Sequence, residues 1–168
     1  MAKLIWGLVG AAAIVGAVVI FKPEQKQESI NRPESAEPLP SMVDWSASFA
    51  IFTNGIFRVF TNRMYHNLSG DAYIEALNPN VVRVKKQGTT WADFFESLPF
   101  ELTEECLVTG AKETFCPAGG RSLKFYLNGE EDAQALRREI RDQDKLLVSF
   151  GSQNSAEIQS QLNRIPNP

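Results

Sequence analysis

The chain has 168 residues and a formal net charge of −3, with a calculated isoelectric point near 5.3. This charge argues against a nucleic-acid partner, because polyanion binding at physiological salt needs several clustered cations. One histidine and two cysteines leave few ligands for a zinc or copper site, so we expect no bound metal or other cofactor.

Residues 1–21 carry the strongest signal. The stretch from Leu4 to Phe21 is an unbroken run of apolar residues and glycine, which Lys22 and Pro23 end abruptly. At about 1.5 Å per residue the run reaches about 27 Å, enough for the hydrocarbon core of a bilayer. It predicts a transmembrane signal-anchor embedded in the lipid bilayer. A cleaved secretory signal and a buried core helix are the alternatives, although no small-residue cleavage site follows the run.

Residues 22–43 differ in composition from both of their neighbours. They contain four prolines, four glutamates and several glutamines and serines, but few apolar residues. Such a segment cannot bury enough apolar surface to offset its ordering entropy. We expect a disordered, extended stalk that lifts the following domain away from the membrane.

Residues 44–151 are long enough for one domain with a single core. The predicted strands cover residues 49–53, 56–61, 73–76 and 81–85, and Asn54-Gly55 predicts a two-residue hairpin between the first two. Later strands are expected over residues 122–127, before Asn128-Gly129, and over residues 145–150. These strands and one main helix predict an α+β fold with the helix packed on a mixed sheet.

The main helix has a clear beginning and end. Thr90 is the expected N-cap with Asp93 three residues later, and Pro99 ends the helix. The helical spacing places one apolar stripe toward the core: Trp91, Phe94, Phe95 and Leu98. Residues 152–168 then predict a short helix over 155–162, or a frayed end, followed by a tail.

The two cysteines, Cys106 and Cys116, enclose a short loop with no metal-ligand or redox spacing around it. An even cysteine count beyond a membrane anchor favours a disulfide in an oxidising compartment. The alternative is a pair of reduced thiols. With a disulfide, we expect a single-pass protein of the cell membrane whose C-terminal domain is extracytoplasmic.

The order of elements resembles a β-grasp module of the ubiquitin or sulfur-carrier kind, over residues 123–129 and 142–151. Most of the ectodomain also resembles an uncharacterised family of small membrane-anchored extracytoplasmic proteins from candidate-phyla bacteria. That resemblance rests on residues 90–98, 106–107, 115–116, 123–129, 144–151 and 157–162. It implies a metal site in members that carry His-x-His pairs, but residues 44–48 and 81–86 of this chain lack histidine.

The motifs exclude more functions than they assign. Neither a G-x-S-x-G elbow, a P-loop nor a G-x-G-x-x-G occurs, and His66 is expected in a surface loop. Arg83, Lys85 and Lys86 form a candidate interaction surface, although a solvated strand face would look the same. A similar cluster contains Arg137, Arg138 and Arg141.

We therefore predict a binding or assembly module without catalytic activity, with a protein or cell-envelope partner. The alternative is a degenerate or auxiliary metal- or ligand-handling protein, as the histidine-bearing relatives imply.

Overall fold

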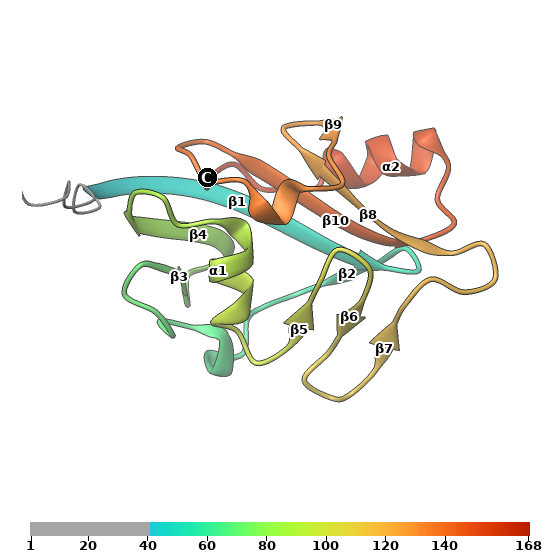
Figure 1. Cartoon of the computed structure of the whole chain (residues 1–168), viewed down its shortest axis with the longest axis horizontal. Coiled ribbons are helices and arrows are strands. Elements are labelled where there is room, and N and C mark those ends of the chain that lie inside the picture. Colours follow the sequence, from blue (N-terminus) through green and yellow to red (C-terminus); the bar gives the residue numbers. More distant parts are fainter. Residues whose placement is uncertain (1–40) are drawn as a thin grey trace, which may run out of the picture. The chain divides into compact units, whose positions relative to one another are not determined.

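The computed structural model describes residues 41–168. The predicted signal-anchor and nearly all of the predicted stalk lie outside these residues. Within residues 41–168, no helix is both long enough and apolar enough to cross a membrane. The described part is an α+β domain with one seven-stranded mixed sheet, one small sheet and two α-helices (Figure 1).

The main sheet has the order β3-β4-β1-β10-β8-β9, and β2 pairs with the end of β1. Its strands are β1 (Met42–Thr53), β2 (Ile56–Arg58), β3 (Ala72–Glu75), β4 (Asn78–Lys86), β8 (Ser122–Leu127), β9 (Glu130–Glu131) and β10 (Lys145–Gly151). β1 and β10 run parallel, with Phe49 opposite Leu146, and all the other neighbours are antiparallel. The first and the last strand of the domain are therefore neighbours at the centre of the sheet.

Two tight turns follow the sequence prediction. Asn54 and Gly55 join β1 to β2 with φ values of 51° and 81°, and Asn128 and Gly129 join β8 to β9 with 55° and 90°. Both residues of a type I′ turn need positive φ, which asparagine and glycine tolerate best. The hairpin at Asn54-Gly55 is confirmed, but its second strand ends at Arg58 and not at Thr61.

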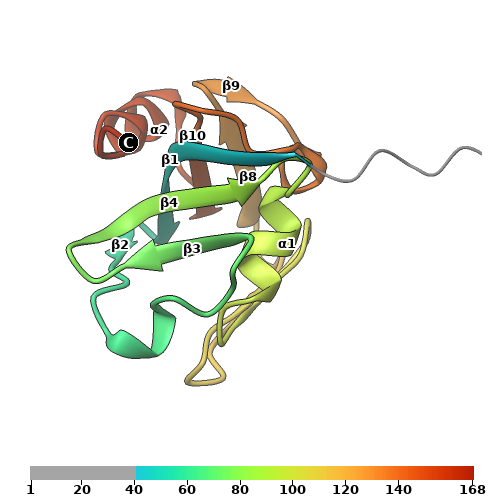
Figure 2. The same ribbon diagram turned by 90° about the vertical axis from the view of Figure 1, so that its left-hand side faces the viewer.

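One face of the main sheet is covered by α1 (Trp91–Glu96), as Figure 2 shows. The predicted capping box is present: Asp93 N donates to Thr90 Oγ1 at 3.1 Å, and Thr90 N donates to Asp93 Oδ2 at 2.8 Å. The four residues of the predicted apolar stripe are all buried. The Phe49 ring of β1 lies 5.5 Å from the rings of Phe94 and Phe95, so the helix is held by aromatic contacts.

The opposite face carries α2 (Ser155–Leu162) and the chain end (Figures 1 and 2). Ile158 and Ile165 bury a second, smaller core against Ala50, Phe52 and Leu147. Successive side chains of a strand point to opposite faces, so β1 supplies both cores. The predicted short helix is confirmed, and it packs on the sheet.

Three short strands form a separate sheet with the order β5-β6-β7. They are β5 (Glu101–Leu102), β6 (Leu107–Val108) and β7 (Thr114–Phe115), and Leu107 reaches into the larger core. Two 3₁₀ turns complete the domain, η1 (Arg63–Tyr65) and η2 (Ala135–Arg137). Neither this sheet nor β9 follows from the sequence analysis.

Candidate binding site

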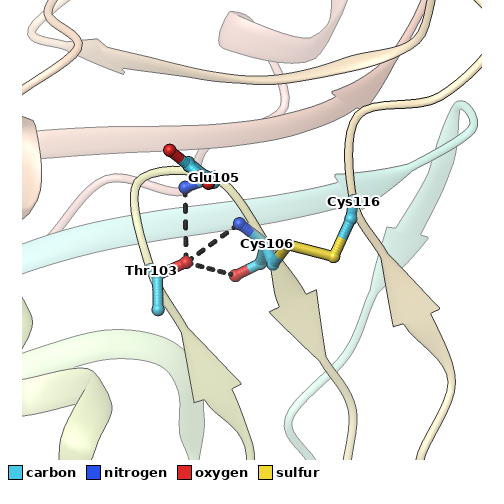
Figure 3. The surroundings of a disulfide bond; sticks show 4 residues. All are labelled: Thr103, Glu105, Cys106 and Cys116. Carbon is cyan, nitrogen blue, oxygen red and sulfur yellow. Dashed lines mark hydrogen bonds between the residues drawn. A yellow bond between two sulfur atoms is a disulfide. The ribbon is translucent and has the colours of Figure 1, made fainter.

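The predicted disulfide joins Cys106 to Cys116, and no free cysteine is present among the described residues. Figure 3 shows the turn that leads into it, which the Thr103 hydroxyl holds. That oxygen accepts hydrogen bonds from Cys106 N at 2.9 Å and from Glu105 N at 3.3 Å. The covalent bond closes the base of the β6–β7 hairpin.

The tip of this hairpin is seated closely against the segment that follows α1. A Cβ atom added to Gly110 would lie 2.9 Å from Pro99 O, closer than real Cβ contacts allow. Within the turn, Glu113 N donates a hydrogen bond to Thr109 Oγ1 at 3.1 Å. The hairpin is therefore fixed at its base by the disulfide and at its tip by close packing.

Beside the hairpin lies an open cavity of about 210 Å³, which we call the aromatic pocket. Its apolar lining comes from the main sheet, the turn after β2 and the small sheet: Ile51, Phe60, Tyr65, Phe100 and Leu107. The Phe60 ring lies 5.2 Å from Tyr65 and 5.8 Å from Phe100, which makes one continuous aromatic wall. The hairpin tip, with Gly110 and Ala111, forms the opposite wall.

One ion pair lies at the rim of the aromatic pocket. Arg58 Nε donates to Thr53 Oγ1 at 2.6 Å, and Arg58 Nη1 lies 3.5 Å from Glu113 Oε2. The guanidinium carbon is also 5.2 Å from the centre of the Phe115 ring. The Glu113 side chain is 55% exposed, so this pair contributes little stability. Its effect is to place a guanidinium at the mouth of a cavity whose lining is mainly apolar.

The histidine predicted in a surface loop is half-buried behind this pocket. His66 Nε2 donates to Phe60 O at 2.8 Å, since a carbonyl oxygen can only accept. This bond positions the backbone of Phe60 and occupies one of the two ring nitrogens of His66. Within residues 41–168, no three side chains of histidine, cysteine, aspartate or glutamate converge to hold a metal ion.

The structure divides the three cations of the candidate interaction surface. Arg83 Nη2 and Lys85 Nζ both lie close to Asp44 Oδ1, at 3.1 and 2.8 Å. The hydrogen bond from Lys85 holds the pKa of Asp44 below its ordinary value. Lys86 Nζ pairs with a different carboxylate, Asp71 Oδ2, at 2.9 Å. Binding of a partner by these cations stays a prediction.

The second basic cluster is paired in the same way. Arg137 lies 2.7 Å from Glu104, and Arg138 lies 2.8 Å from Asp132. Arg141 is 3.9 Å from Glu139. All three arginine side chains are more than half exposed, so these are surface ion pairs.

The aromatic pocket was not predicted from the sequence. Val59 and Phe60 belong to the strand predicted over residues 56–61, and Gly110 and Glu113 lie in the loop between the two cysteines. No role was predicted for Phe100. The available signal was a run of aromatic residues on both sides of Pro99 followed by a glycine inside a disulfide loop. That signal does not indicate which side chains meet.

No family model, curated protein or solved structure matches this chain. The chemistry of the described residues is therefore the basis for assigning a function.

Proposed function

We propose that this protein is a membrane-anchored, extracytoplasmic binding or assembly module without catalytic activity, whose aromatic pocket receives one apolar side chain of a partner protein. The observation that carries the proposal is the pocket itself, an open apolar cavity of about 210 Å³ with walls fixed by a disulfide and by aromatic packing.

The volume of the pocket favours a side chain over a larger ligand. Small-molecule sites usually begin at about 300 Å³, whereas an apolar cavity of about 150 Å³ accepts benzene. A cavity of 210 Å³ thus suits one aromatic or branched aliphatic group. Energetically dominant contacts at protein interfaces are commonly of this kind, with a single anchor side chain in a desolvated pocket.

The surface around the pocket also favours a protein partner. Val59 at the rim is 59% exposed, and Met64, whose methyl group lies beside Gly110, is 46% exposed. Arg58 adds a guanidinium at the mouth, where a carboxylate of the partner could replace the loosely held Glu113. We therefore expect the anchor side chain to lie next to an acidic group.

The proposed location rests on two separate features. The apolar run over residues 4–21 has the length of a signal-anchor, and the disulfide suits an oxidising compartment. Together they favour a domain outside the cytoplasm that is tethered to the membrane.

We further infer that the domain is a variant of the β-grasp fold. This inference is supported by the order β4-β1-β10-β8, in which β10 returns parallel beside β1 after α1 has crossed the sheet. The likeness to the uncharacterised membrane-anchored family also stays a proposal, and it adds no activity.

Site-specific photocrosslinking in the native host tests the function. A photoreactive residue at Val59 should crosslink a partner, and Ala111→Trp should abolish that crosslink by filling the pocket from an exposed position. Glu105→Trp, on an exposed turn outside the pocket, is the matched control and should leave the crosslink unchanged. A crosslink that persists in Ala111→Trp would exclude the pocket as the anchor site.

A further inference from the structure

A second cavity lies on the other face of the main sheet. It is a groove of about 440 Å³ between α2 and the β8–β9 hairpin, which we call the β8–α2 groove. It is separate from the aromatic pocket, because Tyr126 of the groove packs with the smaller core and Ile51 of the pocket belongs to the larger one. Its volume falls within the range of ordinary small-molecule sites.

The floor of the groove combines an aromatic ring with aliphatic side chains. Tyr126 is half-buried, and it packs in the same cluster as Ile158 and Leu162 of α2. The Tyr126 hydroxyl donates to Glu131 Oε2 at 3.4 Å. Burial, followed by the charge of Glu131, raises the pKa of Tyr126, so the phenol stays protonated and the ring stays neutral at physiological pH.

The walls of the groove carry polar groups that both donate and accept hydrogen bonds. Ser149 Oγ donates to Gln153 Oε1 at 3.5 Å, which leaves the Gln153 amide nitrogen able to donate to a ligand. Gln159 Nε2 donates to Asn163 Oδ1 at 3.4 Å, which leaves the Gln159 carbonyl oxygen able to accept. Lys124 and Glu131 add one charge of each sign.

This combination matches a neutral sugar better than the other ligand classes. Lys124 and Glu131 together give the groove no net charge, so its lining does not favour an anionic polymer, and a lipid tail would leave the polar walls without partners. A pyranose ring instead presents an apolar C–H face for an aromatic ring and hydroxyl groups that donate and accept. An acetamido group adds a methyl, which can contact the half-buried Leu162 at the α2 side of the groove.

We propose that the β8–α2 groove binds a neutral oligosaccharide that contains N-acetylated amino sugars. The pyranose ring lies on Tyr126, and its hydroxyl groups bond to Gln153, Gln159 and Glu131. The proposal is independent of the aromatic pocket and of its protein partner.

Calorimetric titration of the full chain in lipid nanodiscs with triacetylchitotriose tests this assignment. We expect saturable binding of triacetylchitotriose and at least tenfold weaker binding of maltotriose. Tyr126→Ala should bind triacetylchitotriose about tenfold more weakly, since loss of an aromatic contact costs on the order of 1.4 kcal/mol. Tyr126→Ala also removes contacts to the smaller core, so it can weaken binding by destabilising the fold. Gln159→Ala is therefore a second variant, at an exposed position, and it should also weaken binding.

The matched control is Gln134→Ala, which truncates an exposed glutamine outside the groove and should bind like the unmodified chain. The assignment is overturned if triacetylchitotriose shows no binding at about 10 mM, where even a very weak site would be occupied. It is also overturned if Gln159→Ala binds as tightly as Gln134→Ala, or if maltotriose binds equally well.

Discussion

Removal of the disulfide should lower the stability of the domain by an amount that follows from the loop it closes. Cys106 and Cys116 are separated by 10 positions in the sequence. In the chain-entropy model, a loop of about ten residues restricts the unfolded chain by about 2.7 kcal/mol at 25 °C. We therefore expect the double variant Cys106→Ser, Cys116→Ser to lose roughly this much free energy of unfolding.

The melting temperature converts this loss into a measurable shift. A domain of about 130 residues has an unfolding entropy of roughly 0.27 kcal/mol/K, so a loss of about 2.7 kcal/mol lowers the melting temperature by about 10 °C. Differential scanning calorimetry of the variant measures this shift directly. The unmodified chain should melt near the temperature of the variant once a reductant is added, whereas the variant itself should not respond to reductant.

The same variant tests whether the disulfide shapes the pocket. Thr90→Ala removes the cap of α1 at a cost of about 1 kcal/mol without touching the β6–β7 hairpin. Well below both melting temperatures, the cysteine variant should bind a pocket ligand more weakly than Thr90→Ala does. A melting shift below about 2 °C, or free thiols in protein from the native host, would show that the disulfide does not stabilise the domain as proposed.

Three further predictions concern location, metal and pH. External protease on intact cells should cut within residues 22–43 and release the domain, and full protection would contradict an extracytoplasmic location. Titration of the purified protein with zinc, copper(II) and calcium should show no site of micromolar or better affinity, and one such site would favour the metal-handling alternative. Arg138 is the main cause of the lowered pKa of Asp132, whose ordinary value is 3.8. The stability from this pair is therefore present above that pH and lost as the pH falls through the lowered pKa, so Asp132→Asn should flatten the decline of stability in acid.

The sequence predicted α1 and the Asn54-Gly55 turn because interactions between residues close in the sequence determine both. The capping box at Thr90, the helical spacing of the aromatic residues and Pro99 all act within one turn of α1, and the structure has that helix. The Asn54-Gly55 turn likewise needs only its own positive φ angles. These features do not depend on the rest of the fold.

The beginning of β1 was harder to predict. Val43, Trp45 and Ala47 alternate with polar residues, but the small and polar side chains made the strand signal weak. Ser48 is fully buried although it is polar, because its strand lies at the centre of the sheet. From Ala47 to Thr53 the strand is buried on both faces, so the alternation of its first residues does not continue along it.

The site could not be predicted for a related reason. The strands of the small sheet have two residues each, too few for any periodicity. Arg58 and Glu113 are far apart in the sequence and meet only because the disulfide and the close approach of Gly110 to Pro99 bring the hairpin beside β2. In the candidate interaction surface, residues that are close in the sequence are instead separated. Arg83 and Lys86 pair with different carboxylates, those of Asp44 and Asp71.

The most direct test of the account is whether the aromatic pocket accepts an apolar group. Indole is a suitable probe, because it has the size of a tryptophan side chain, and nuclear magnetic resonance of the full chain in nanodiscs reports where it binds. We predict saturable shift changes confined to Phe60, Phe100, Leu107 and their neighbours, with none in Ala111→Trp. The absence of saturable shifts at millimolar indole, or equal shifts in Ala111→Trp, would contradict the account.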